Sequence, residues 1–180
     1  CIEAVRLLMA ENGLKIDDVE KIDLFAPTML GKNFSYYPPA TSVDTASSVK
    51  YLTAMYLLTE DPGPDWYLEF DRYLRTDAYR RIAAKIELHM DEALQQLLET
   101  EGRLLGKAAV KVGKNRYEKE VSFVKGSPED PFSMAEIKAK FMKLASPVIG
   151  EICAQRFLKT IEKGPCDRNT AQIISELQEK

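Results

Sequence analysis

The hydrophobic pattern of this 180-residue chain changes near residue 131, and this change constrains the fold more than any other feature. Before it, segments that alternate with period two, as half-buried strands do, are interleaved with amphipathic helical stripes. After it the pattern is purely helical, starting at Ser133 with a capping box that Glu136 completes. The sequence therefore predicts an α+β region with a small, mainly antiparallel sheet and flanking helices, followed by an all-helical C-terminal segment.

Three regions supply the strands of the predicted sheet. In the first, Ile22 and Leu24 alternate with Lys21 and Asp23, so that one face is buried. In the second, His89 falls on the polar side of the alternation. The regions are Val19–Ala26, Lys85–Met90 and a hairpin of residues 109–112 and 116–124.

Helices are predicted between and after these strands. Asp44 is expected to cap one helix over residues 45–59, Thr76 or Asp77 another over 76–84, and Asp91 a short leucine-rich helix. Residues 31–41 show neither period and are predicted to form an aromatic-rich loop. The chain begins inside an amphipathic helix over residues 2–12 and ends with three helices, the last after Asn169, whose narrow apolar stripes need a covering surface. We therefore expect the chain to be part of something longer.

Charge and composition limit the classes of function that the chain can have. The 25 Lys and Arg residues against 28 Asp and Glu residues give a net charge of −3, which offers no basic surplus for nucleic acid and argues against a membrane-surface role. No apolar run approaches the roughly 18 to 20 residues of a membrane span. The three cysteines are odd in number and widely spaced, which favours a reducing, cytoplasmic location. With a single histidine, we expect no metal site and no cofactor.

Isolated motifs carry little chemistry. Residues 102–108 are similar to a phosphate-binding loop but are one residue short and lack the Ser or Thr that holds magnesium. His89 is interpreted as a surface histidine without a neighbouring carboxylate motif, rather than as a general base. Cys153 is interpreted as a core thiol and Cys166 as a more exposed one.

A combination of segments is more specific than any single motif. Lys-Gly-x-Pro-x-x-Pro at residues 125–131 is followed by Lys-Phe-x-x-Leu at 140–144. Together with the segments 44–54 and 76–88, in this order and spacing, the chain resembles the C-terminal part of the MmgE/PrpD family over nearly its whole length. That family includes 2-methylcitrate dehydratase, cis-aconitate decarboxylase and iminodisuccinate epimerase.

The resemblance implies a domain organisation. Residues 1–16 would belong with a helical part, residues 17–131 would form an α+β, lid-like domain, and residues 132–180 would dock on a helical domain. The partner would be that N-terminal helical domain or a partner subunit, in a homo- or hetero-oligomer. The leucine-rich helix at residues 91–105 departs from the family, in which we expect a shorter connection.

The resemblance also implies a site. Enzymes of this family act without metal on small di- or tricarboxylates, with the histidine, lysine and acidic groups mostly from the N-terminal part. The family tyrosine in a Ser-x-x-Tyr context matches Tyr51, which could donate a hydrogen bond or a proton to the substrate. Ser48 is a weaker candidate for binding a substrate carboxylate. The alternatives are that Tyr51 only packs on its helix and that Ser48 only caps it.

Three functions stay open at this point. The leading hypothesis is the C-terminal domain of a 2-methylcitrate dehydratase-like lyase that is inactive alone. The second is a catalytically silent domain that binds or regulates another chain. The third is an epimerase or isomerase, which shares proton abstraction but differs in what leaves.

Overall fold

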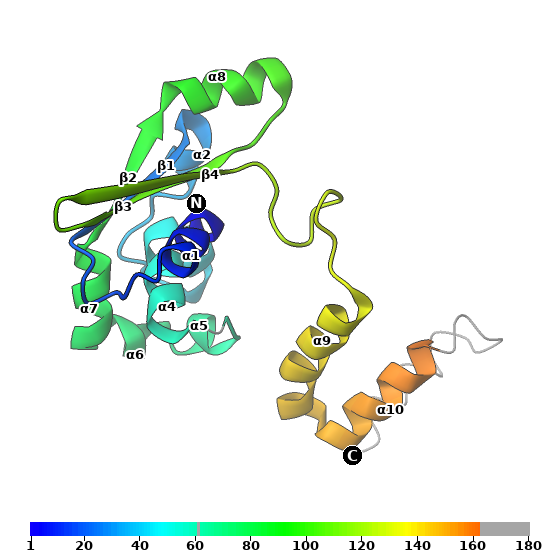
Figure 1. Cartoon of the computed structure of the whole chain (residues 1–180). Coiled ribbons are helices and arrows are strands. Elements are labelled where there is room, and N and C mark those ends of the chain that lie inside the picture. Colours follow the sequence, from blue (N-terminus) through cyan, green and yellow to red (C-terminus); the bar gives the residue numbers. More distant parts are fainter. Residues whose placement is uncertain (61, 163–180) are drawn as a thin grey trace. The chain divides into compact units, whose positions relative to one another are not determined.

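The computed structural model describes residues 1–60 and 62–162 of the chain. The chain divides into two compact units, a sheet unit of residues 1–124 and a helical unit that begins at Lys125. In Figure 1 the helices and strands of the sheet unit are drawn in blue to green, and the helices of the helical unit in yellow to orange. The change of hydrophobic pattern lies just after this division.

The sheet unit is built on a four-stranded mixed sheet with the order β2-β1-β3-β4. Strand β1 pairs in parallel with β2 and antiparallel with β3, which in turn pairs antiparallel with β4. The predicted α+β class and mainly antiparallel sheet are therefore confirmed, with one parallel pair. That pair needs a long connection between its strands, and helices α2 to α7 provide it. The strands are β1 (Lys21–Pro27), β2 (Ile86–Asp91), β3 (Gly106–Val112) and β4 (Asn115–Val121).

One face of the sheet packs on the helices α1 (Ile2–Glu11), α4 (Val49–Thr59) and α7 (Asp77–Ala84). The alternation predicted for β1 is observed, because Ile22 and Leu24 are wholly buried here. The two-residue connection of the β3–β4 hairpin follows the expected signal, and Gly113 takes the positive φ of 58° that this tight turn requires. The other principal core residues are Val5, Leu8, Tyr51, Met55, Tyr79, Ile82, Ile86, Ala108 and Val110.

Helix α1 is part of the sheet unit. Its buried residues Ala4, Val5 and Leu8 face β3, β4 and α4. The resemblance groups residues 1–16 with a helical part, and in the structure the apolar stripe of α1 packs within the sheet unit. Docking of its outer side on a further domain stays a prediction.

The single helix predicted over residues 45–59 is wrong in one respect, because the structure contains two. Helix α3 (Ser42–Ala46) is capped by Thr41, which forms a capping box with Asp44. Helix α4 starts afresh because the Ser48 side chain accepts a hydrogen bond from the backbone N–H of Tyr51 at 3.3 Å. A serine at this position competes for the backbone and restarts the helix.

The remaining helices of the sheet unit are short connections, apart from α8. Asp91 caps α8 as predicted, because its Oδ1 accepts from the N–H groups of Ala93 and Leu94. The aromatic-rich loop predicted over residues 31–41 is shorter than expected, because its first residues lie in α2. The bounds are α2 (Thr28–Asn33), α5 (Asp65–Leu68), α6 (Phe70–Leu74) and α8 (Glu92–Glu101).

The helical unit consists, in its described part, of α9 (Met134–Ile149) and α10 (Glu151–Glu162). The predicted capping box of Ser133 and Glu136 is observed at the start of α9. Phe141 and Phe157 stack with their ring centroids 5.5 Å apart and join the two helices. The helix predicted after Asn169, and Cys166, lie outside the described residues. In the described part of the chain, no helix has the length and apolar character needed to cross a membrane.

Candidate functional site

Tyr51 lies in the core of the sheet unit rather than at its surface. It is 0% exposed, and its hydroxyl donates a hydrogen bond to the backbone carbonyl of Trp66. Its ring centroid lies 5.7 Å from that of Tyr79. Burial raises the pKa of Tyr51 above its usual value, so the phenol is neutral and acts as a hydrogen-bond donor.

Ser48 is placed beside Tyr51 by the start of α4. Its hydroxyl accepts from the N–H of Tyr51, and the side chain is fully buried. The next residue, Val49, donates its N–H to the carbonyl of Phe34 at 3.0 Å, which holds the aromatic loop against this helix start. The structure therefore brings the two candidate residues together. Their roles toward a substrate stay predictions, because the contacts observed are structural.

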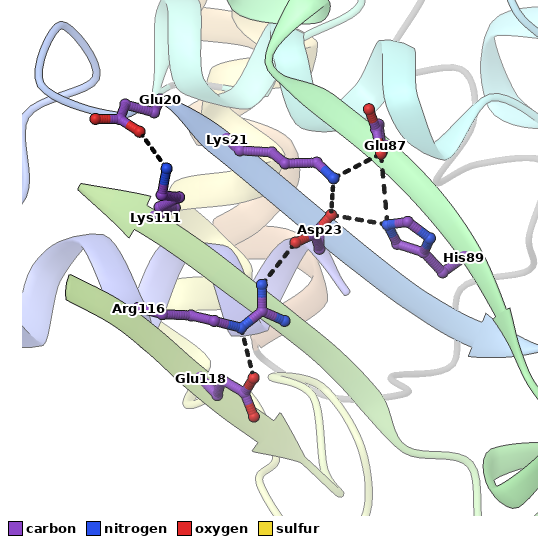
Figure 2. A network of polar contacts seen from close by, with 8 residues as sticks. All are labelled: Glu20, Lys21, Asp23, Glu87, His89, Lys111, Arg116 and Glu118. Carbon is purple, nitrogen blue, oxygen red and sulfur yellow. Dashed lines mark hydrogen bonds and ion pairs between the residues drawn. The ribbon is translucent and has the colours of Figure 1, made fainter. Parts of the chain in front are cut away.

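A second polar cluster lies on the face of the sheet opposite to the core. Figure 2 shows Asp23 at its centre, in contact with cationic or ring nitrogen atoms from three strands. Asp23 Oδ1 lies 2.7 Å from His89 Nε2 and 3.0 Å from Lys21 Nζ, while Oδ2 lies 2.8 Å from Arg116. The Asp23 side chain is only 7% exposed, so these contacts compensate a nearly buried charge.

The strand register explains why these side chains meet. Asp23 is paired with Glu87 on β2 and with Ala109 on β3. The small methyl group of Ala109 leaves space for the Arg116 side chain of β4 to reach across β3 to Asp23. Glu87 and Glu118 then bind Lys21 and Arg116 on their outer sides, at 2.7 and 2.8 Å.

This environment determines the protonation of Asp23. Burial by itself would raise the pKa of the carboxyl, but hydrogen bonds from His89, Lys21 and Arg116 outweigh it and lower the pKa to about 2. Asp23 is therefore ionised at neutral pH and too weak a base to remove a proton from carbon. The cluster fixes the sheet electrostatically, and its geometry assigns it no catalytic step.

Comparison with known proteins gives the chain its family. The family described as the MmgE/PrpD C-terminal domain matches residues 1–163. The chain belongs to this family. The match confirms the resemblance found in the sequence and its restriction to the C-terminal portion. None of the curated proteins compared with the chain matches it.

Membership of the MmgE/PrpD family does not by itself make the Asp23 cluster a site. Ligand atoms of Asp23, Glu87 and His89 lie within 4.8 Å of one another, which is close enough for one metal ion. However, the Lys21 ammonium group already binds both carboxylates, and Arg116 holds the second oxygen of Asp23. A divalent ion would have to displace one cation and lie near another, so we assign no metal to this cluster.

The interpretation of His89 as lacking a carboxylate neighbour was wrong. The signal was present in the alternation, because Asp23, His89 and Arg116 all occupy polar positions of predicted strands. Alternation tells which side chains share a face, but the order of the strands decides which of them touch. The parallel pairing of β1 with β2 was the missing information.

Proposed function

We propose that this chain is the C-terminal part of a cytoplasmic, metal-independent lyase that acts on a small di- or tricarboxylate. Its reaction would be the dehydration of a 2-methylcitrate-like substrate. It would work only together with an N-terminal helical domain, either in the same protein or in a partner subunit. The observation that carries this proposal is the MmgE/PrpD C-terminal domain match across residues 1–163.

The side chains of the chain support the need for a partner. Dehydration next to a carboxylate requires a base that removes a proton from carbon. The one histidine, His89, is bound to Asp23 on the polar sheet face, and Asp23 has a pKa of about 2. We therefore place the base in the helical domain and retain Tyr51 as the hydrogen-bond or proton donor from this chain.

The helical unit supports the same conclusion from packing. Val148 and Ile152 are 74% and 80% exposed, and in the described part of this unit Cys153 and Ala154 are the buried residues. An open groove of this unit is lined by Lys140 and by six apolar residues, which are Ile137, Phe141, Leu144, Ala145, Val148 and Ile149. Large exposed apolar patches of this kind mark interaction surfaces. A helical domain of the same enzyme is the occupant that we propose.

The buried position of Tyr51 favours one other function, a catalytically silent domain that binds or regulates another chain. For catalysis, the Tyr51 hydroxyl must leave the Trp66 carbonyl and reach a substrate. If Tyr51 keeps this contact in the assembled protein, it serves the core alone.

Product analysis of the assembled protein tests the proposal. The chain is co-expressed with an N-terminal MmgE/PrpD helical domain and supplied separately with methylcitrate, citrate and cis-aconitate. We expect loss of water from a hydroxy acid. Loss of carbon dioxide would identify a decarboxylase. Inversion of a stereocentre without loss of any group would identify an epimerase. A stable complex without turnover would identify the catalytically silent domain.

A further inference from the structure

Lys50 is a half-buried cation without a paired acid. It follows the helix-capping residues of α4, and its Nζ lies 4.6 Å from the ring centroid of Tyr37. Among the described residues it makes no salt bridge, and the acid that attracts it, Glu87, is bound to Lys21 at 2.7 Å. Burial lowers the pKa of Lys50, and the attraction of Glu87 offsets this in part.

Tyr79 carries a hydroxyl group without a partner in the described part of the chain. The residue is 1% exposed, and its oxygen neither donates nor accepts a hydrogen bond of acceptable geometry. The Tyr37 hydroxyl approaches it, and burial together with this neighbour raises the pKa of Tyr79. A buried phenol that lacks a partner destabilises the fold, so its retention needs a reason.

Tyr37 connects these two groups and reaches the surface. It belongs to the loop of residues 34–41 and is 40% exposed. The loop is fixed to the start of α4 by a bridge between Ser35 and Ser48 and by the hydrogen bond from Val49 to Phe34. Its ring thus lies under the Lys50 ammonium group while its hydroxyl lies beside that of Tyr79.

We propose that Lys50 and Tyr37 form a subsite for one carboxylate group of the substrate, with Tyr79 as a positioning residue. The Lys50 ammonium group pairs with the carboxylate, and the Tyr37 hydroxyl donates a hydrogen bond to it. When the ligand is bound, the Tyr79 hydroxyl donates in turn to the Tyr37 oxygen, which orients the Tyr37 proton toward the ligand. The choice of a polycarboxylate as ligand rests on the proposed function, whereas the unpaired cation and hydroxyl are features of the structure.

The subsite is adjacent to the residue already proposed to act on the substrate. Lys50 precedes Tyr51 in α4, and the Tyr79 ring lies against that of Tyr51 at 5.7 Å. Lys50 and Tyr51 therefore both belong to the first turn of α4, while the Tyr51 hydroxyl is bound to the Trp66 carbonyl in the chain alone. A substrate with two or three carboxylates offers one group to Lys50 while another part of it reacts.

Binding of propane-1,2,3-tricarboxylate to the 180-residue chain tests the subsite without any turnover. Titration calorimetry is combined with lysine side-chain NMR shifts for the native chain, Lys50→Met and the control Lys114→Met, which removes an exposed lysine from the hairpin turn. We expect saturable binding that Lys50→Met weakens by about tenfold or more and that Lys114→Met leaves unchanged. Equal binding by Lys50→Met and the native chain, or no saturable binding, overturns the proposal.

Tyr79→Phe separates positioning from packing. We expect it to weaken binding of the tricarboxylate by about three- to tenfold without lowering the melting temperature, because in the ligand-free chain the Tyr79 hydroxyl makes no hydrogen bond of acceptable geometry. A lower melting temperature with unchanged affinity would show a purely structural residue and contradict its role. Because these assays need no catalysis, failure of the subsite leaves the lyase proposal intact. Likewise, absence of turnover in the assembled enzyme would not contradict a measured affinity of the chain for the tricarboxylate.

Discussion

His89 Nε2 lies 2.7 Å from Asp23 Oδ1, across the one parallel strand pair of the sheet. The His89 ring also stacks on Phe25, with centroids 5.3 Å apart. A carboxylate that is nearly buried needs such partners, because an uncompensated charge at this position would be costly. The pair therefore links the edge strand β2 to the centre of the sheet, and the contribution of Asp23 to stability depends on pH.

Asp23→Asn is expected to lower stability at neutral pH and to flatten its acid dependence. The folded pKa of Asp23, about 2, is below the ordinary 3.8, so its stabilisation is complete above pH 3.8 and is lost as pH falls toward 2. The shift corresponds to about 2 kcal/mol of unfolding free energy at pH 7. Urea unfolding between pH 2 and pH 7 measures it. Asp71→Asn, which changes an exposed acid on α6, is the control. Parallel pH curves for Asp23→Asn and the native chain would contradict this account.

Tyr51→Phe is expected to have two separate effects. In the assembled enzyme it should reduce turnover by about a hundredfold or more, the scale of a lost proton or hydrogen-bond donor. In the chain itself it should cost about 1 kcal/mol, because the buried Trp66 carbonyl loses its donor. Tyr51→Ala should cost about 3 kcal/mol or more by opening a cavity. If Tyr51→Phe loses stability but keeps turnover within a few-fold of the native enzyme, Tyr51 has a structural role in the core and no catalytic one.

The chain without a helical domain is expected to self-associate through the helical unit. Sedimentation velocity at micromolar concentration should show oligomers, and the double variant Val148→Asp, Ile152→Asp should shift them toward monomer because both side chains are exposed. Val43→Asp, at a valine that is 77% exposed in the sheet unit, should leave association unchanged. A monomeric native chain that binds no hydrophobic dye would refute this prediction.

Turnover of the assembled enzyme is expected to survive strong chelators. The carboxylates of the Asp23 cluster that could bind a metal ion are already paired with Lys21 and Arg116. We therefore expect the substitution His89→Gln to leave the metal content of the protein unchanged. Activity after dialysis against EDTA is the measurement. A loss that added zinc or manganese restores would show a metal requirement.

Much of the fold was predictable because local signals agree with the tertiary structure. The alternation of Ile22 and Leu24, the cap at Asp91 and the box of Ser133 with Glu136 all appear where expected. The break at Ser48 was missed because the apolar stripe predicted for residues 45–59 lies in α4, so it carries no information about where that helix begins. The Ser48 hydroxyl, which accepts from the N–H of Tyr51, marks the beginning of α4.

The site was less predictable, for a reason of geometry. Sequence pattern assigns a residue to a face, whereas a site depends on which faces and strands become neighbours. Arg116 of β4 reaches Asp23 of β1 across β3, and Tyr37 meets Lys50 where the loop is tied to the start of α4. Such contacts follow from pairing order and loop path, which one sequence does not specify.

Turnover as a function of added partner tests the central claim most directly. The purified chain is titrated with a purified N-terminal MmgE/PrpD helical domain, and formation of the unsaturated product from methylcitrate is followed by its ultraviolet absorbance. The account predicts no turnover by either component alone and a rate that saturates at an equal ratio of the two. Turnover by the chain alone, or none at any ratio despite complex formation, would contradict it.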